Sequence, residues 1–269
     1  MKNGLSIDLE DWFCAYNLRI GVEDWGKQEL RVEKNARRIL DLLDKHNVKA
    51  TWFVLGWFAE RVPDLIREAE QRGHEIATHG YSHTVLTDMT PEQFDTDLAL
   101  ALTATRECVQ QPIRGFRAPS FTITNKTLWA FDVLTKHGIT YDSSIFPISG
   151  HPDYGIGDAP LTIHKRGAVT EVPMSVAEVF GKRIPCSGGG YFRVFPYALT
   201  RYLMRACNRQ GRPVIFYLHP WEVDPGQPRR KLSWSKSFRH YFNLDQTLAR
   251  LDHLLSDFEF VPIKEVVGL

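Results

Sequence analysis

The chain has 269 residues, of which 43% are apolar and 24% charged, so it holds enough apolar material for one large folded domain. A formal net charge of +1 argues against a large nucleic-acid interface, which would need a clustered excess of basic residues. No run approaches the roughly 20 apolar residues of a membrane-spanning helix, which leaves only peripheral contact with a membrane compatible with the sequence.

Strand and helix patterns alternate along the whole chain. Short apolar runs predict strands at 5–9, 50–56, 74–80, 113–119, 139–144, 212–220 and 258–263. Amphipathic runs predict helices at 32–46, 63–73, 91–108, 125–138, 196–210 and 244–258. About seven β–α alternations predict an α/β fold, a distorted (β/α) barrel with a mostly parallel sheet.

No linker divides the chain, so we expect a single domain over 1–269, with a Gly/Pro-rich loop or hairpin insertion at about 147–195. A doubly wound sheet is the alternative fold. It is disfavoured because no nucleotide-binding glycine motif follows the first strand. The N-terminus lacks the apolar core of a signal peptide and the four cysteines form no CxxC pair, so we expect a cytoplasmic protein with reduced, buried thiols. The oligomeric state is not predicted.

Polar side chains interrupt the apolar strands near their carboxyl ends. They are Asp8, Glu10, Asp11, His79, His83, Arg117, Asp142 and His219. Because the carboxyl ends of parallel strands meet at one rim, we expect these groups to gather in a single site. Asp142 either orients His219 or caps a turn.

The stretch HEIATHGYSH contains three histidines that can be paired in two ways. A zinc-protease helix needs two histidines four positions apart, with the glutamate beside the first, and His74 and His79 are five apart. His79 and His83 are four apart, and Gly80 permits a tight bend after the strand. We expect these two imidazoles and one carboxylate to form a three-ligand catalytic metal site.

The third metal ligand has two candidates in the run Asp8-Leu9-Glu10-Asp11. Residue i+2 of a strand points to the same face, which favours Glu10. A bend after Leu9 favours Asp11 instead. The sequence leaves both open.

Six motifs, SIDLEDWF, THGYSH, GFRAPSFT, YDSSIFP, GGGYFR and YLHPWE, occur in the order found in a known family. Over about residues 5–262 the chain resembles the NodB-homology polysaccharide deacetylases, a carbohydrate esterase family. More narrowly, it resembles the exopolysaccharide-cluster branch associated with exosortase systems. The resemblance implies a distorted β/α barrel and a divalent metal, foremost zinc, with cobalt, nickel, manganese or iron as alternatives.

The resemblance also implies roles for individual residues. Asp8 matches the general base and His219 the general acid that protonates the leaving amine. Arg117 would pair with Asp8 and orient it. Pro119 would shape the following loop, and the backbone N–H near Ser120 would help to hold the oxyanion.

Three further residues are expected to touch the substrate. The glycine-rich run before Tyr191 and Arg193 reads as a mobile loop that presents both side chains to a sugar. Trp221 and Glu222 come shortly after His219 and are expected to line the pocket, where the indole would stack on a sugar. For Trp221, packing in the core is the alternative. His240 falls on a helical pattern and is expected to face solvent.

Together these features predict a metal-dependent hydrolase that removes acetyl from an N-acetylated amino sugar. The substrate would be a polysaccharide or its lipid- or nucleotide-linked precursor. A hydrolase of another non-peptide C–N bond, such as a cyclic amide or imide, is the alternative enzyme. A catalytically silent sugar-binding module is the alternative from a different class.

Overall fold

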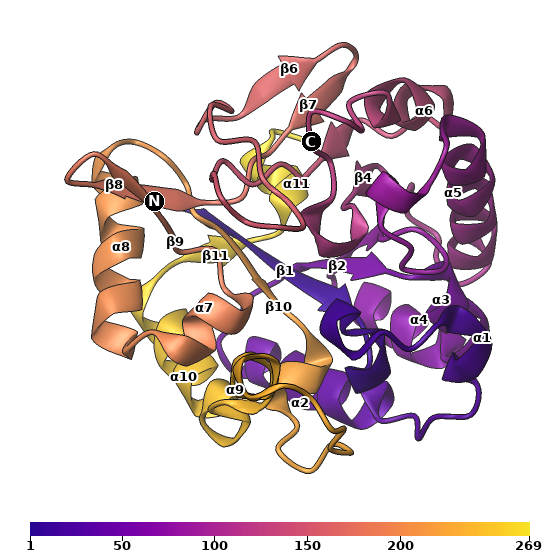
Figure 1. Ribbon diagram of the computed structural model, residues 1–269, viewed down its shortest axis with the longest axis horizontal. Helices are drawn as coiled ribbons and strands as arrows, with labels where there is room; N and C mark the ends of the chain where they lie inside the picture. The colour runs from indigo at the N-terminus through magenta and orange to yellow at the C-terminus, as the bar shows by residue number, and fades with distance from the viewer.

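The centre of the molecule is a curled, mostly parallel sheet of nine strands, seen in a computed structural model that describes all 269 residues (Figure 1). The strand order is β10-β1-β2-β3-β4-β5-β7-β6, with β11 beside β1. The strands of this sheet are β1 (Asn3–Leu9), β2 (Thr51–Val54), β3 (Glu75–Thr78), β4 (Gly115–Phe116), β5 (Tyr141–Asp142), β6 (His164–Arg166), β7 (Val169–Glu171), β10 (Ile215–Leu218) and β11 (Phe260–Val261). Only β6 runs antiparallel to its neighbour.

The sheet forms a half-barrel whose open side, between β7 and β10, is spanned by residues 172–188. The Val172 N–H donates to the Asp142 carbonyl, and Gly188 forms a parallel bridge with Tyr217 of β10. Within this segment β8 (Val176–Val179) and β9 (Lys182–Pro185) form a separate antiparallel hairpin. The predicted distorted β/α barrel is confirmed in this form.

Most of the helices cover the outside of the sheet (Figure 1). The helices are α1 (Val22–Trp25), α2 (Val32–Lys45), α3 (Gly56–Arg61), α4 (Pro63–Gln71), α5 (Pro91–Arg106), α6 (Ala130–Lys136), α7 (Gly189–Val194), α8 (Tyr197–Arg209), α9 (Trp234–Tyr241), α10 (Leu244–Asp257) and α11 (Ile263–Val266). None has the length and apolarity needed to cross a membrane. The main hydrophobic core draws side chains from Leu5 in β1 to Phe260 in β11.

The glycine-rich run differs from its prediction as a mobile loop. Gly188 has φ +120°, and a Cβ there would lie 2.0 Å from the Tyr217 carbonyl oxygen. Gly189, with φ +54°, begins α7. Glycine is therefore required here for close packing of the backbone against β10, and the run leads into a helix.

Candidate active site

The register of the strands brings the polar residues at the strand ends to one rim of the sheet. Leu9, Val54, Thr78 and Phe116 are Cα partners in a row across β1, β2, β3 and β4. The residues that follow them in the chain therefore leave the sheet at the same level. These strands are short and buried throughout, so the first polar side chains after them turn into the barrel mouth.

Three potential metal ligands meet at this rim. One ligand atom from each of Glu10, His79 and His83 lies within 4.8 Å of the others, and all three residues are buried. Nε2 of His79 and Nε2 of His83 lie 3.2 and 3.0 Å from Glu10 Oε1. Burial alone would raise the pKa of Glu10, but His83, His219 and a hydrogen bond to His79 hold it well below its usual range.

The histidine geometry fits a divalent cation. His79 Nδ1 lies 2.7 Å from the Arg117 carbonyl oxygen, which can only accept, so Nδ1 carries the proton and Nε2 presents a lone pair. His83 Nε2 is buried and lacks a well-aligned hydrogen-bond partner despite its proximity to Glu10. Two imidazoles and one carboxylate are a donor set that catalytic zinc takes.

An irregular bend brings His83 back to His79, as the tight bend expected at Gly80 allows. Gly80 has φ +79° and His83 φ +54°. The carboxylate of Asp97 on α5 accepts hydrogen bonds from the backbone N–H groups of Tyr81 and Ser82 at 2.8 and 3.2 Å. Asp97 is a positioning residue that sequence reasoning missed, because nothing in the local pattern links α5 to this bend.

Asp11 does not join the metal ligands, which corrects one of the two alternatives. Its carboxylate accepts hydrogen bonds from the backbone N–H groups of Trp12, Arg31 and Val32 at 2.7, 2.5 and 2.7 Å. These bonds cap the short 3₁₀ turn after β1 and tie it to the start of α2. The carboxylate is thereby committed to local structure, and Glu10 is the one that faces the histidines.

Asp8 and Arg117 form a buried ion pair beside the ligand cluster. Arg117 Nη1 lies 2.6 Å from Asp8 Oδ1, and both side chains are almost fully buried. The guanidinium also donates to Ser6 Oγ and to the Ser143 carbonyl, and it stacks over Phe53 at 4.2 Å. These contacts fix the Asp8 carboxylate, while its second oxygen, Oδ2, faces His219.

His219 is oriented by Glu222, one 3₁₀ turn later. His219 Nδ1 lies 2.6 Å from Glu222 Oε1, while Nε2 lies 3.9 Å from Asp8 Oδ2 and 3.6 Å from Glu10 Oε1. Burial alone would lower the pKa of His219, but the carboxylates of Glu10, Glu222 and Asp8 raise it to about 9. Glu222 was expected to line the pocket, but it is fully buried and orients His219 from behind the cavity wall. The His-x-x-Glu spacing was the signal that could have identified this role.

Asp142, the other candidate to orient His219, caps a turn. Its carboxylate accepts hydrogen bonds from the N–H and hydroxyl groups of Ser144 at 3.1 and 2.6 Å. It lies in β5, across the sheet from β10. The orienting role therefore falls to Glu222.

Arg193 is a structural ion-pair partner and not the expected sugar contact. Its side chain is 2% exposed, and Nε donates to Glu222 Oε2 at 2.6 Å. The remaining guanidinium N–H groups donate to the carbonyl groups of Arg239, His240 and Phe242 at 2.9 Å. Four of the five guanidinium N–H groups are therefore used within the protein. Arg193 borders the cavity, but its side chain holds Glu222, which in turn holds His219.

The Trp221 ring is likewise packed against protein. His219 and His240 both stack on it, with ring centroids 5.2 and 4.7 Å away, and Trp221 is 7% exposed. The ring forms part of the cavity wall, but its faces are not open to a sugar. His240, expected to face solvent, is buried in this stack, where burial lowers its pKa to about 3.

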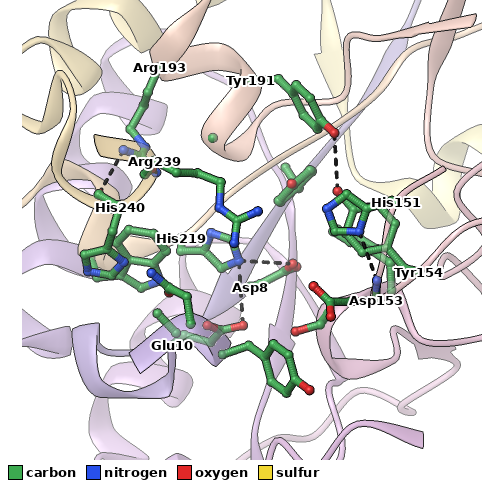
Figure 2. A pocket seen from close by; sticks show the side chains of 18 of the residues that line it. Asp8, Glu10, His151, Asp153, Tyr154, Tyr191, Arg193, His219, Arg239 and His240 are labelled. Carbon is green, nitrogen blue, oxygen red and sulfur yellow. Dashed lines mark hydrogen bonds and ion pairs between the residues drawn. The ribbon is translucent and has the colours of Figure 1, made fainter. Parts of the chain in front are cut away.

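A cavity of about 500 Å³ opens above these groups (Figure 2), a size that suits a saccharide ligand. Ser120 and Tyr191 line it, whereas Pro119 is buried and does not. The structure thus places two of the three remaining expected substrate contacts at the cavity. Tyr191 comes from α7, and Ser120 has a left-handed backbone with φ +52°. Phe121 follows, and its ring packs edge-on against Tyr217.

The sequence matches two family models in succession. Residues 24–141 match a model described as "Polysaccharide deacetylase", and residues 143–268 match one described as "Domain of unknown function (DUF3473)". A peptidoglycan deacetylase of Helicobacter pylori is 28% identical over 158 residues, which cover 58% of this chain and 53% of the relative. A chitooligosaccharide deacetylase of a Bradyrhizobium species is 36% identical over 97 residues, or 36% of this chain and 42% of the relative. The chain thus spans about half, or less, of the length of these relatives.

Solved structures share the fold. A Mycobacterium smegmatis protein assigned to the polysaccharide deacetylases superposes with a TM-score of 0.61 at 20% identity, covering 98% of this chain and 89% of that one. A CE4 family pseudoenzyme from Bacillus anthracis superposes with a TM-score of 0.52 at 14% identity, covering 99% and 65%. At such identities these likenesses concern the fold alone. The sequence match over 24–141 makes this part of the chain similar to the polysaccharide deacetylases, in agreement with the resemblance of its motifs, and the half-barrel is the fold that the solved structures share.

Proposed function

We propose that this protein is a metal-dependent N-deacetylase of an N-acetylated amino sugar, carried by a polysaccharide or by its lipid- or nucleotide-linked precursor. One observation carries the proposal. Asp8 and His219 line one cavity together with the Glu10, His79 and His83 cluster, and each is held from behind, Asp8 by Arg117 and His219 by Glu222.

Glu10, His79 and His83 would hold the divalent cation, foremost zinc. When bound, this cation would polarise the acetyl carbonyl and make water a better nucleophile. Asp8, fixed through Oδ1 by Arg117, keeps Oδ2 free to take a proton from the attacking water. Because Oδ1 is bound to Arg117 and Oδ2 is free, the proton acceptor points in one fixed direction.

His219 Nε2 is placed to give a proton to the leaving amine. Glu222 holds Nδ1–H, which fixes the ring and stabilises the protonated imidazole. Water attacks the amide carbon, the C–N bond breaks, and the products are acetate and a free amino sugar. Backbone near Ser120 supplies the candidate oxyanion donor, since Ser120 lines the cavity.

Aromatic side chains around the cavity would contact the sugar in place of Trp221. Phe238 on α9 is 40% exposed, Tyr16 is 39% exposed, and Tyr191 is half-buried, and all three line the cavity. Such rings offer apolar faces, to which sugars bind through their C–H surfaces. The arrangement suits a saccharide better than a small charged metabolite.

A silent sugar-binding module is the rival reading, since a pseudoenzyme shares this fold. It is opposed by the complete set of acid, base and ligand groups. Mass spectrometry of acetyl loss tests the proposal across free N-acetylglucosamine, its oligomers, and nucleotide- and lipid-linked forms, with and without chelator. We expect chelator-sensitive loss of acetyl from at least one form. Loss from none, or hydrolysis only of a cyclic amide included in the panel, would refute the proposal.

A further inference from the structure

Helix α9 borders the cavity and belongs to a basic stretch of the chain. Residues 225–244 contain five basic side chains and no aspartate or glutamate. The basic residues are Arg229, Arg230, Lys231, Lys236 and Arg239. Of these five, only Arg239 lines the cavity.

Arg239 differs from the other arginines of the site in having an uncommitted guanidinium. Arg117 and Arg193 are buried and held by several hydrogen bonds, whereas the Arg239 side chain is exposed and makes no hydrogen bond or ion pair within the protein. Figure 2 shows it extending from α9 into the cavity. Its backbone is nevertheless anchored, because the Arg239 carbonyl accepts a hydrogen bond from Arg193.

The charge of Arg239 reaches the opposite wall of the mouth. Burial lowers the pKa of His151, and Arg239 lowers it further, while Asp153 opposes the shift. Burial raises the pKa of Tyr154, and Arg239 partly opposes that rise. Asp153 lines this wall but forms no ion pair with Arg239, so the guanidinium remains available to a ligand that enters between the walls.

We propose that Arg239 forms an anion subsite, which binds a carboxylate or phosphate carried by the saccharide next to the sugar that is deacetylated. The inference rests on the proposed function and narrows its substrate to anionic saccharides. A guanidinium matches the two oxygens of such groups in a fork geometry.

The anion can come from a polymer or from a precursor, and three test substrates distinguish these two sources. A tetrasaccharide that alternates N-acetylglucosamine with glucuronic acid presents a carboxylate of a polymer. Uridine diphosphate N-acetylglucosamine presents the phosphates of a precursor. An N-acetylglucosamine tetramer is the neutral reference.

The test compares kcat/KM for these three substrates in wild type, Arg239→Gln and Arg239→Lys. Lys236→Gln is the matched control, because Lys236 lies on the same helix but does not line the cavity. We expect Arg239→Gln to lose about tenfold in kcat/KM, mainly through KM, for one anionic substrate, the size of one charged hydrogen bond at a partly exposed site. For the neutral tetramer, Arg239→Gln should change kcat/KM by less than about twofold. Arg239→Lys should keep most of the preference for the anionic substrate over the neutral one, and Lys236→Gln should resemble wild type.

If Arg239→Gln loses kcat/KM equally on neutral and anionic substrates, or loses it on neither, the anion subsite is refuted and the proposed deacetylase function still stands. If wild type deacetylates none of the three, the proposed function fails for them, and calorimetric binding of the same compounds then decides the subsite. Tighter binding of an anionic compound that Arg239→Gln abolishes supports the subsite. Equal binding by wild type and Arg239→Gln refutes it.

Discussion

Replacing Arg193 tests whether this residue supports the site from within or touches the substrate. In Arg193→Met the buried carboxylate of Glu222 loses its ion-pair partner, and three backbone carbonyl groups lose their donors. Removing one partner of a buried ion pair costs about 3–5 kcal/mol. We therefore expect Arg193→Met to lower the free energy of unfolding by about 4 kcal/mol or more, a large share of the typical total of about 5–15 kcal/mol.

Arg193→Lys should cost about half as much, because lysine keeps the charge but cannot reproduce the planar fork of four donated bonds. Urea unfolding, followed by circular dichroism and by tryptophan fluorescence, measures both variants, and agreement of the two probes checks for two-state behaviour. In thermal unfolding, 4 kcal/mol corresponds to a decrease in Tm of about 10 °C for a chain of this size. Arg209→Met is the control, since Arg209 is exposed and forms no ion pair.

A direct sugar contact predicts the opposite pattern for the same variants. Arg193→Met would then keep its Tm within about 2 °C of wild type while KM rose tenfold or more. That outcome would refute the assignment of Arg193 as the residue that holds Glu222. It would also remove the structural reason for the placement of His219.

Glu10→Gln should weaken zinc binding by at least about a hundredfold in calorimetry. Asp11→Asn should bind zinc like wild type, but its free energy of unfolding should be about 2 kcal/mol lower. Zinc binding that is lost in Asp11→Asn and kept in Glu10→Gln would restore Asp11 as the ligand. Glu222→Gln should lower kcat by about a hundredfold or more with little change in KM, because His219 loses the negative charge that stabilises its protonated ring. An unchanged kcat would contradict the role of Glu222 in orienting and stabilising His219. Burial lowers the pKa of His74 from 6.5 to about 4, so the unfolded chain binds more protons between these values and stability falls as the pH falls through them. Urea titrations should show His74→Gln losing about 2 kcal/mol less than wild type between pH 7 and pH 5, and equal losses would show that His74 does not titrate in this way.

The catalytic groups could be located from the sequence because they obey a local rule. Parallel strands end at a common rim, so polar residues after buried strands, such as His79, Arg117 and His219, converge whatever the details of the loops. The alternation of side chains along β1 likewise favoured Glu10. Asp11 is not a metal ligand because its carboxylate accepts hydrogen bonds from backbone N–H groups at the start of α2. This contact lies 20 positions away in the chain, and no local pattern reveals it.

The errors share one physical cause. Arg193 and His240 were judged by their local polarity, but long-range packing buries both around Trp221 and Glu222. The glycine run before Arg193 has the composition of a flexible loop, yet close approach to β10 is what requires glycine there. Buried ion pairs and backbone approaches between distant segments are properties of the assembled fold, and a single sequence does not encode them in a readable pattern.

The central claim is that Asp8 acts as the base beside a metal held by Glu10, His79 and His83. Acetate release from an N-acetylglucosamine tetramer, or from the substrate that the mass-spectrometry panel selects, tests it most directly. Wild type and Asp8→Asn are each measured as purified, after chelation, and after zinc is restored. We predict that wild type loses activity with chelator and regains it with zinc, and that Asp8→Asn binds zinc but releases acetate about 10²–10⁴-fold more slowly throughout. Undiminished acetate release by Asp8→Asn, or by the chelated wild type, would contradict the claim.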